Sequence, residues 1–195
     1  MINCFERNCL TGRYGYSDYV TKGMDAEVVG DLEEEPVDLP TIKAHLRLDA
    51  DDTTEDTWLT DTISEARMIC EGYSGLSFGA KTIVLTYDEY AEGFLKLPFG
   101  PVDAITTVEI DQEEAVLDSD YTLAGTKIKL YGSDRNLAIT YTTKATEDQS
   151  YAPLYRSAIK AQVAFMYAHR GDEIVSHICD AAQTILTPIK VLNVF

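Results

Sequence analysis

The chain has 195 residues, 45% of them hydrophobic, and a formal net charge of −17. This length suits one domain or a domain with an insertion, and the hydrophobic content is sufficient for a core. A charge this negative argues against tight binding to DNA phosphates, which requires clustered Lys and Arg. No apolar stretch is long enough to span a bilayer, and no signal-peptide pattern begins the chain, so we expect a protein that is made and used, or assembled, in the cytoplasm, without membrane contact.

Residues 1–36 are predicted to form an N-terminal arm and linker, because they are rich in Gly, Tyr and acids and show no sustained periodicity. Residues 24–32 are compatible with one short strand, and Glu33-Glu34-Glu35-Pro36 indicates a solvated linker. Tyr14, Tyr16 and Tyr19 are candidate contacts to a partner, since aromatic side chains are enriched in interfaces. Scattered surface tyrosines also occur without any function.

Residues 37–81 predict a hairpin of two helices. Asp38 can cap the first helix, and Pro40 is tolerated in its first turn. Asp52 and Glu55 have the spacing of a capping box for the second helix. Gly72 and Gly75 are expected to end that helix. Its apolar residues recur at intervals of four and three, which places on one stripe Leu59, Ile63, Ala66, Cys70 and Tyr73.

Residues 82–145 change to the pattern of a small antiparallel β-sheet inserted between helices. The segments are short, rich in β-branched and aromatic residues, and separated by turn residues. Ala124-Gly125-Thr126 is a predicted hairpin loop. The expected strands are Thr82–Tyr87, Phe94–Leu97, Ala104–Ile110, Tyr121–Leu123, Lys127–Leu130 and Leu137–Thr142.

Residues 146–186 predict the C-terminal helices. Pro153 begins a helix that Gly171 ends, and a shorter helical piece is plausible from Asp172 to about Thr184. The first of these helices should pack against the second helix of the hairpin. Its expected contact stripe is Leu154, Ala158, Ala161, Phe165 and Ala168.

Residues 187–195 predict an extended C-terminal tail, because Pro188 disfavours a helix at the residue before it. The alternating apolar residues that follow are typical of a strand that is covered or added to another sheet. Two interpretations stay open, namely pairing with the β insertion of the same chain and docking onto a partner. The docking interpretation makes the candidate partner-binding residues Ile189, Lys190, Val191, Leu192, Val194 and Phe195.

No motif indicates catalysis or a cofactor. His169, His177 and Cys179 would meet if the chain turned back near Gly171, but their intervals match no common zinc spacing and a further ligand would be needed. The four cysteines are expected to be reduced, and no metal is predicted. The acidic run from Asp49 lacks the Gly and Glu that a calcium loop requires.

The ordered motifs resemble the head–tail connector (adaptor, or head-completion) proteins of tailed bacteriophages. The resemblance begins with a capped helix of the form Leu-x-x-Ile-Lys-x-His-Leu-Arg at residues 39–47. It continues through Glu65-Ala66-Arg67 and Gly72-Tyr73-Ser74-Gly75 into a loop of the type Leu-Pro-x-Gly-Pro-Val at 97–102. It resumes at Pro153 and again at 186–191, so it covers most of residues 37–195.

The resemblance implies an α+β fold, a helical bundle with an inserted small antiparallel sheet and extended termini. It also implies a structural, non-enzymatic virion protein at the neck. The expected partners are the portal protein, neighbouring copies in a ring that looks dodecameric, and a stopper or tail-tube or tail-terminator protein, while DNA passes through without specific binding. The alternatives are a small acidic metal-dependent hydrolase near His169 and His177, and an acidic DNA-mimic inhibitor that exploits the charge of −17.

Overall fold

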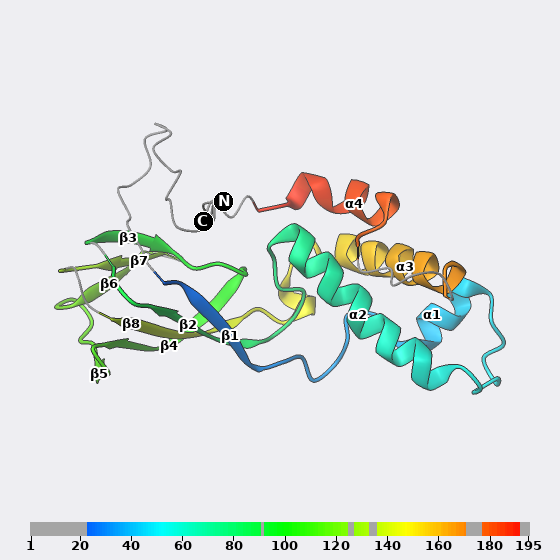
Figure 1. The fold of residues 1–195 in the computed structure, drawn as a ribbon, viewed down its shortest axis with the longest axis horizontal. Helices are drawn as coiled ribbons and strands as arrows, with labels where there is room; N and C mark the ends of the chain where they lie inside the picture. Colours follow the sequence, from blue (N-terminus) through cyan, green and yellow to red (C-terminus); the bar gives the residue numbers. More distant parts are fainter. Residues whose placement is uncertain (1–22, 91, 125–126, 133–135, 171–176, 192–195) are drawn as a thin grey trace, which may run out of the picture.

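The computed structural model describes residues 23–90, 92–124, 127–132, 136–170 and 177–191. The molecule is elongated, with helices gathered at one end and antiparallel strands at the other (Figure 1). The predicted α+β class is confirmed for these residues, and the helical part is formed by segments on either side of the strands in sequence. No helix of the described ranges is long and apolar enough to cross a membrane.

The helical part contains four α-helices and two short 3₁₀ turns among the described residues. The α-helices are α1 (Leu39–Leu46), α2 (Asp56–Ser74), α3 (Ala152–Ala168) and α4 (Asp180–Leu186), and the 3₁₀ turns are η1 (Thr146–Asp148) and η2 (Thr187–Ile189). α2 packs against α3, as predicted, and α4 packs against both. The α2 stripe supplies much of this core, because Leu59, Ile63, Ala66 and Cys70 are at most 2% exposed.

The caps of the hairpin helices agree with the sequence prediction only in part. Asp38 caps α1 by accepting a hydrogen bond from the Thr41 N–H at 3.0 Å. The predicted capping box is wrong, since α2 begins only at Asp56 and the Glu55 side chain makes no capping bond. Gly72 lies inside α2. Gly75 ends the helix in a left-handed conformation, with φ of 70°, which a residue without Cβ adopts at little cost.

The buried face of α3 is rotated relative to the predicted stripe. Leu154 is 37% exposed and Ala168 is also exposed. The buried positions are Ala152, Tyr155, Ala158, Ile159, Gln162, Val163 and Met166. The sequence prediction failed because all but four of the 17 residues of this helix are apolar or aromatic, so several stripes fit the spacing. Gln162 lies inside the core since its amide binds the Cys179 N–H at 2.8 Å and the His177 carbonyl at 3.1 Å.

The strands form two antiparallel sheets, whereas the sequence analysis predicted one. The first sheet has the order β1-β2-β8-β4-β5, with β1 (Asp25–Gly30), β2 (Thr82–Tyr87), β8 (Leu137–Thr143), β4 (Val102–Ile110) and β5 (Glu113–Glu114). The second has the order β3-β7-β6, with β3 (Gly93–Lys96), β7 (Lys127–Leu130) and β6 (Tyr121–Ala124). Their alternating buried residues share one core, which includes Leu85, Ile139 and Ile128.

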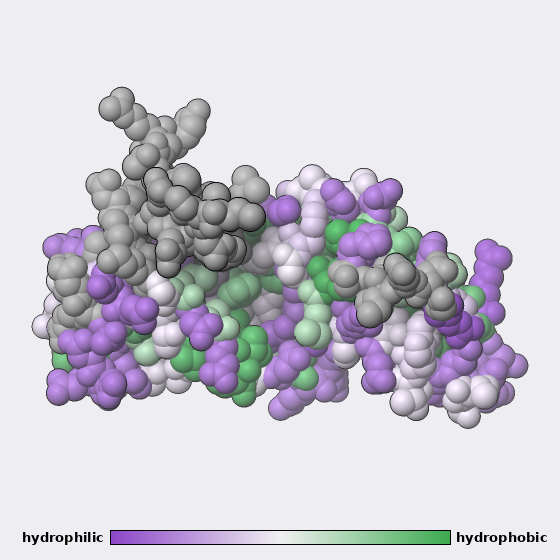
Figure 2. Space-filling model, viewed as in Figure 1, coloured by the Kyte–Doolittle hydropathy of each residue, from purple (hydrophilic) through white to green (hydrophobic). Residues whose placement is uncertain are grey.

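Part of the N-terminal region, which was predicted as arm and linker up to residue 36, belongs to the larger sheet as β1. The expected short strand is present, and it pairs antiparallel with β2 as an edge strand of the larger sheet. Val28 and Val29 are 50% and 55% exposed on this edge. Among the coloured residues of Figure 2, hydrophilic ones are spread over the face shown, and hydrophobic ones form smaller patches between them.

Candidate assembly surfaces

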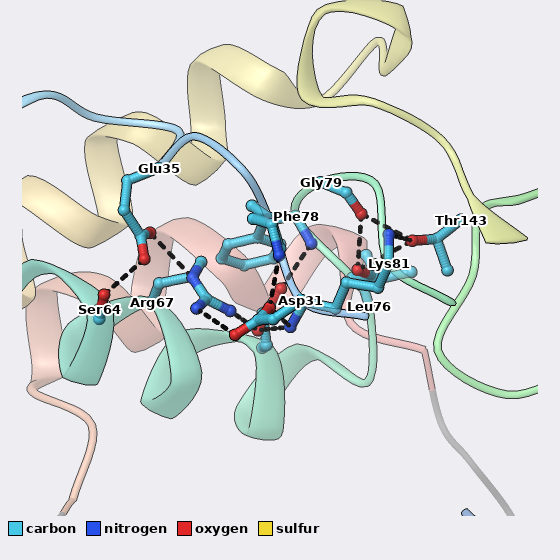
Figure 3. Close-up of polar contacts among 12 residues, drawn as sticks. Asp31, Glu35, Ser64, Arg67, Leu76, Phe78, Gly79, Lys81 and Thr143 are labelled. Carbon is cyan, nitrogen blue, oxygen red and sulfur yellow. Dashed lines mark hydrogen bonds and ion pairs between the residues drawn. The ribbon is translucent and has the colours of Figure 1, made fainter. Parts of the chain in front are cut away.

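The junction between the helices and the sheets is a dense set of polar and aromatic contacts. The Thr143 hydroxyl lies at 2.6 Å from the Gly79 carbonyl and at 3.2 Å from the Ser77 hydroxyl, and it accepts a hydrogen bond from the Lys81 N–H at 2.9 Å (Figure 3). The Phe78 ring stacks on the Tyr155 ring of α3, with centroids 4.0 Å apart. These contacts join the helices to the sheets at both places where the chain passes between them, namely between α2 and β2 and between β8 and α3.

Arg67 of α2 lies at the centre of an ion-pair network at this junction (Figure 3). Its guanidinium donates to Glu35 at 2.8 Å, to Glu71 at 2.9 Å and to Asp31 at 3.1 Å, and its side chain is only 3% exposed. Lys81 binds Glu71 at 2.7 Å. The prediction of a solvated linker is therefore wrong at Glu35, because this carboxylate holds the segment after β1 against α2.

Asp31 has a lowered pKa in this network. Partial burial opposes the shift, but the hydrogen bond from the Leu32 N–H and the charges of Arg67 and Lys81 outweigh it. Glu71 also accepts a hydrogen bond from the Phe78 N–H at 2.8 Å. The Glu71 carboxylate thus connects α2 to Phe78 and Lys81, which lie in the segment between α2 and β2. These bonds fix the position of the helices relative to the sheets.

Two grooves of opposite charge lie at the junction. The first, of about 520 Å³, is lined by the acids of residues 31–35 together with Glu147, and Lys81 is its one basic residue. The second, of about 530 Å³, we call the basic groove, because three lysines and one carboxylate line it. These charged residues are Lys96, Lys144, Lys190 and Asp148. Its apolar lining comes from Leu97, Phe99, Pro101, Val102, Tyr155, Ile189 and Val191.

The described part of the C-terminal tail borders the basic groove. Ile189 lies in the η2 turn, so the prediction that the chain is extended from this residue is wrong there. The Val191 N–H donates to the Ser74 carbonyl at 2.8 Å, and the Lys190 ammonium lies 4.0 Å from the centroid of the Tyr73 ring. Ile189 and Val191 pack against the helical core. The tail is therefore anchored on α2 up to Val191, and this part does not pair with the β insertion.

The other candidate contact residues lie outside the described residues. These are Leu192, Val194 and Phe195 of the tail and Tyr14, Tyr16 and Tyr19 of the N-terminal region. Their proposed contacts with a partner remain predictions.

The metal-site candidates lie near one another but do not form a site. The His169 and His177 rings both contact Phe165, at centroid distances of 4.3 and 5.7 Å. Cys179 is buried and caps α4, where its sulfur accepts a hydrogen bond from the Ala182 N–H at 3.5 Å. Within the ranges that the structure describes, no three His, Cys, Asp or Glu side chains are grouped closely enough to hold a metal ion.

A second polar and aromatic cluster lies where α2 begins and α3 ends. Glu55 accepts hydrogen bonds from Arg170 and from the Tyr167 hydroxyl, and these bonds lower its pKa. The Arg170 guanidinium lies 4.3 Å from the Tyr167 ring centroid, and Trp58 packs edge-on against Tyr167 at 5.9 Å. Glu55 thus joins α2 to α3 instead of forming the predicted capping box.

Comparison with solved structures identifies the fold. A chain in the structure "Neck of empty GTA particle computed with C6 symmetry" superposes with a TM-score of 0.69, at 18% identity, over 88% of this chain and 97% of that chain. The chain has the fold of a gene transfer agent neck component. A chain of "Virion of native gene transfer agent (GTA) particle" matches with a TM-score of 0.69, at 16% identity, over 87% of this chain and 97% of that chain.

The neck fold is found again in "Neck of native GTA particle computed with C12 symmetry", with a TM-score of 0.61 at 15% identity, over 87% of this chain and 97% of that chain. No family model matches the sequence, and no curated protein matches it. The similarity is therefore one of fold, and it extends over both the helical part and the sheets.

Proposed function

We propose that the chain is a structural virion protein, a head–tail connector that assembles as a ring under the portal. The ring would extend the DNA conduit and dock the next neck or tail component, without catalysing a reaction. The observation that carries this proposal is the TM-score of 0.69 to a chain of a particle neck, over 88% of this chain and 97% of the other. Neck structures computed with C6 and C12 symmetry favour a ring of many copies, and we propose twelve.

The C-terminal tail is the proposed portal-binding segment. The chain is fixed on α2 up to Val191, so the apolar residues that follow leave from a defined point next to the basic groove. Leu192, Val194 and Phe195 would then supply the buried side chains of the contact, and Lys190 a charge at its rim.

Removal of residues 192–195 should separate folding from attachment. We expect the melting temperature of the truncated protein to stay within about 2 °C of the parent value, since Ile189 and Val191 keep their contacts with the helices. Binding to isolated portal-bearing heads should fall at least tenfold. The measurements are thermal unfolding followed by circular dichroism, and co-sedimentation with the heads.

A variant of unchanged length provides the control for the truncation. Replacement of Leu192, Val194 and Phe195 by Ser should weaken head binding as strongly as the deletion does, if the side chains make the contact. Normal head binding by both variants would contradict the docking role of the tail.

The proposed conduit should not hold DNA. The chain has 33 acidic and 16 basic residues, and several of the basic ones are used in ion pairs with its own carboxylates. We expect no retardation of a duplex by the purified protein at about 150 mM salt, because counterion release requires clustered cations. A tight, salt-sensitive shift in a gel retardation experiment would contradict this expectation.

A further inference from the structure

A hydrogen-bonded turn after β5 presents two aliphatic side chains to solvent. Val116 and Leu117 are 61% and 51% exposed. The Val116 N–H donates to an Asp120 carboxylate oxygen at 2.9 Å, and the Asp120 N–H donates back to the Val116 carbonyl at 2.8 Å. The Asp118 N–H donates to the Tyr121 carbonyl at 2.7 Å. Because these bonds already order the turn, a contact made there costs little conformational entropy.

The surroundings of these two side chains are strongly acidic. Glu113, Glu114, Asp118 and Asp120 flank them, and the sequence has no Lys or Arg between residues 97 and 126. We call residues 113–120 the acidic turn. An apolar contact point that is flanked by carboxylates fits an apolar recess that is bordered by positive charge.

The basic groove has the complementary properties. Its lining combines apolar side chains with Lys96, Lys144 and Lys190, in a chain whose net charge is −17. Its volume of about 530 Å³ is within the range of clefts that hold ligands or a few side chains of a partner. The groove lies at the junction with the helices, whereas β5 lies at the end of the sheets away from the helices (Figure 1). The two surfaces therefore cannot satisfy one another within a single copy.

We propose that the acidic turn of one copy docks in the basic groove of the next copy. Val116 and Leu117 would contact the apolar lining, and the carboxylates beside them would face the three lysines. This contact is head-to-tail, the type that closes into a ring when the rotation between copies is favourable. The inference rests on the proposed ring function and assigns the residues that join neighbouring subunits.

Charge reversal tests the contact with two variants of the full chain. The groove variant carries Lys96→Glu and Lys144→Glu, which leaves Lys190 of the proposed portal-binding tail unchanged, and the turn variant carries Glu113→Lys and Glu114→Lys. All four side chains are outside the core, so both variants should fold. Each variant alone should self-associate at least tenfold more weakly than the parent in sedimentation velocity at low salt. An equimolar mixture should recover association, because every groove then meets a turn of opposite charge.

A matched pair of substitutions tests the apolar part of the proposed contact. Leu117→Ser should weaken self-association at least fivefold, while Leu154→Ser, at a position on α3 that is 37% exposed, should leave it unchanged. Carbodiimide cross-linking of a mixture of ¹⁴N- and ¹⁵N-labelled protein should give mixed-isotope links between residues 113–120 and the groove lysines. Unchanged association of the charge-reversal variants, no recovery in their mixture, or links made only elsewhere would overturn the contact.

Binding to portal-bearing heads separates this inference from the proposed function. If the parent is monomeric in solution, the same variants are compared by their copy number on isolated heads and by cross-linking there. A parent that joins the heads in full number, with groove lysines cross-linked to the portal or to the tail of the same chain, would overturn only the subunit contact. A parent that joins neither heads nor other copies would overturn both.

Discussion

Ile63→Asp should unfold the helical part or leave it marginally stable. Ile63 is 2% exposed, and it lies in the core between α2, α3 and α4. An unpaired carboxylate at this position costs several kcal/mol, which is a large fraction of the about 5–15 kcal/mol that stabilises an ordinary domain. Urea unfolding followed by circular dichroism measures the loss.

The control for this substitution is on the same helix. Met68 is 60% exposed, so Met68→Asp should change the free energy of unfolding by less than about 0.5 kcal/mol. Phe165→Asp should cost less than Ile63→Asp, because Phe165 is only partly buried at the edge of the core. An Ile63→Asp variant that unfolds at the parent's urea concentration would show that the packing of α2 on α3 is wrong.

Arg67→Met should destabilise the protein by about 3 kcal/mol, because it removes the cation shared by two largely buried carboxylates, Glu35 and Glu71. Glu71 and Glu35 lose their ion pairs with Arg67, and of these two carboxylates only Glu71 keeps another cation, Lys81. Arg156→Met is the matched control. Arg156 is paired with a mostly exposed Glu147, so its loss should cost less than about 1 kcal/mol. Equal effects of the two substitutions in urea unfolding would contradict the central role of Arg67.

The stability of the same two variants, Arg67→Met and Arg156→Met, should depend differently on pH below about pH 4. Because the folded-state pKa of Asp31 is below its ordinary value of 3.8, ionised Asp31 stabilises the protein above about pH 4, and this stabilisation is lost as the pH falls through the lowered pKa. Without the Arg67 charge the pKa of Asp31 should rise towards its ordinary value. Stability should therefore fall less steeply with acid below pH 4 in Arg67→Met than in Arg156→Met.

Periodicity was sufficient to predict α1, α2, α3 and most strands, because most of these elements bury one regular face. The last helical piece was predicted from Asp172 to about Thr184, whereas α4 spans Asp180–Leu186. The α2 stripe is confirmed for Leu59, Ile63, Ala66 and Cys70, because most of the residues between them are polar and cannot replace them in the core. The α3 stripe was only partly correct, because apolar residues occur on several of its faces: Ala158 is buried, whereas Leu154 is 37% exposed. Two sheets instead of one could not be predicted, since alternation within a strand does not say which strand is its neighbour.

The candidate assembly surfaces were harder to predict from the sequence than the helices and strands. Arg67 and Glu71 are four residues apart on α2, a spacing that indicates an ion pair, but Asp31, Glu35 and Lys81 join them only through the tertiary fold. The basic groove collects lysines from residues 96, 144 and 190, which no local pattern connects. The acidic turn contains adjacent apolar residues whose exposure follows from the turn geometry and not from their hydrophobicity.

The two ends of the segment between α2 and α3 lie side by side, and this affects how the chain can fold. The Thr143 N–H donates to the Lys81 carbonyl at 2.9 Å, so the two ends of the inserted region are neighbours. Once the strands have paired, the long stretch between α2 and α3 acts as a short tether, which reduces the entropic cost of bringing these helices together by about 1 kcal/mol. The paired strands therefore hold the end of α2 near the start of α3 before these helices pack. A slow step in strand pairing would delay the packing of α3 on α2.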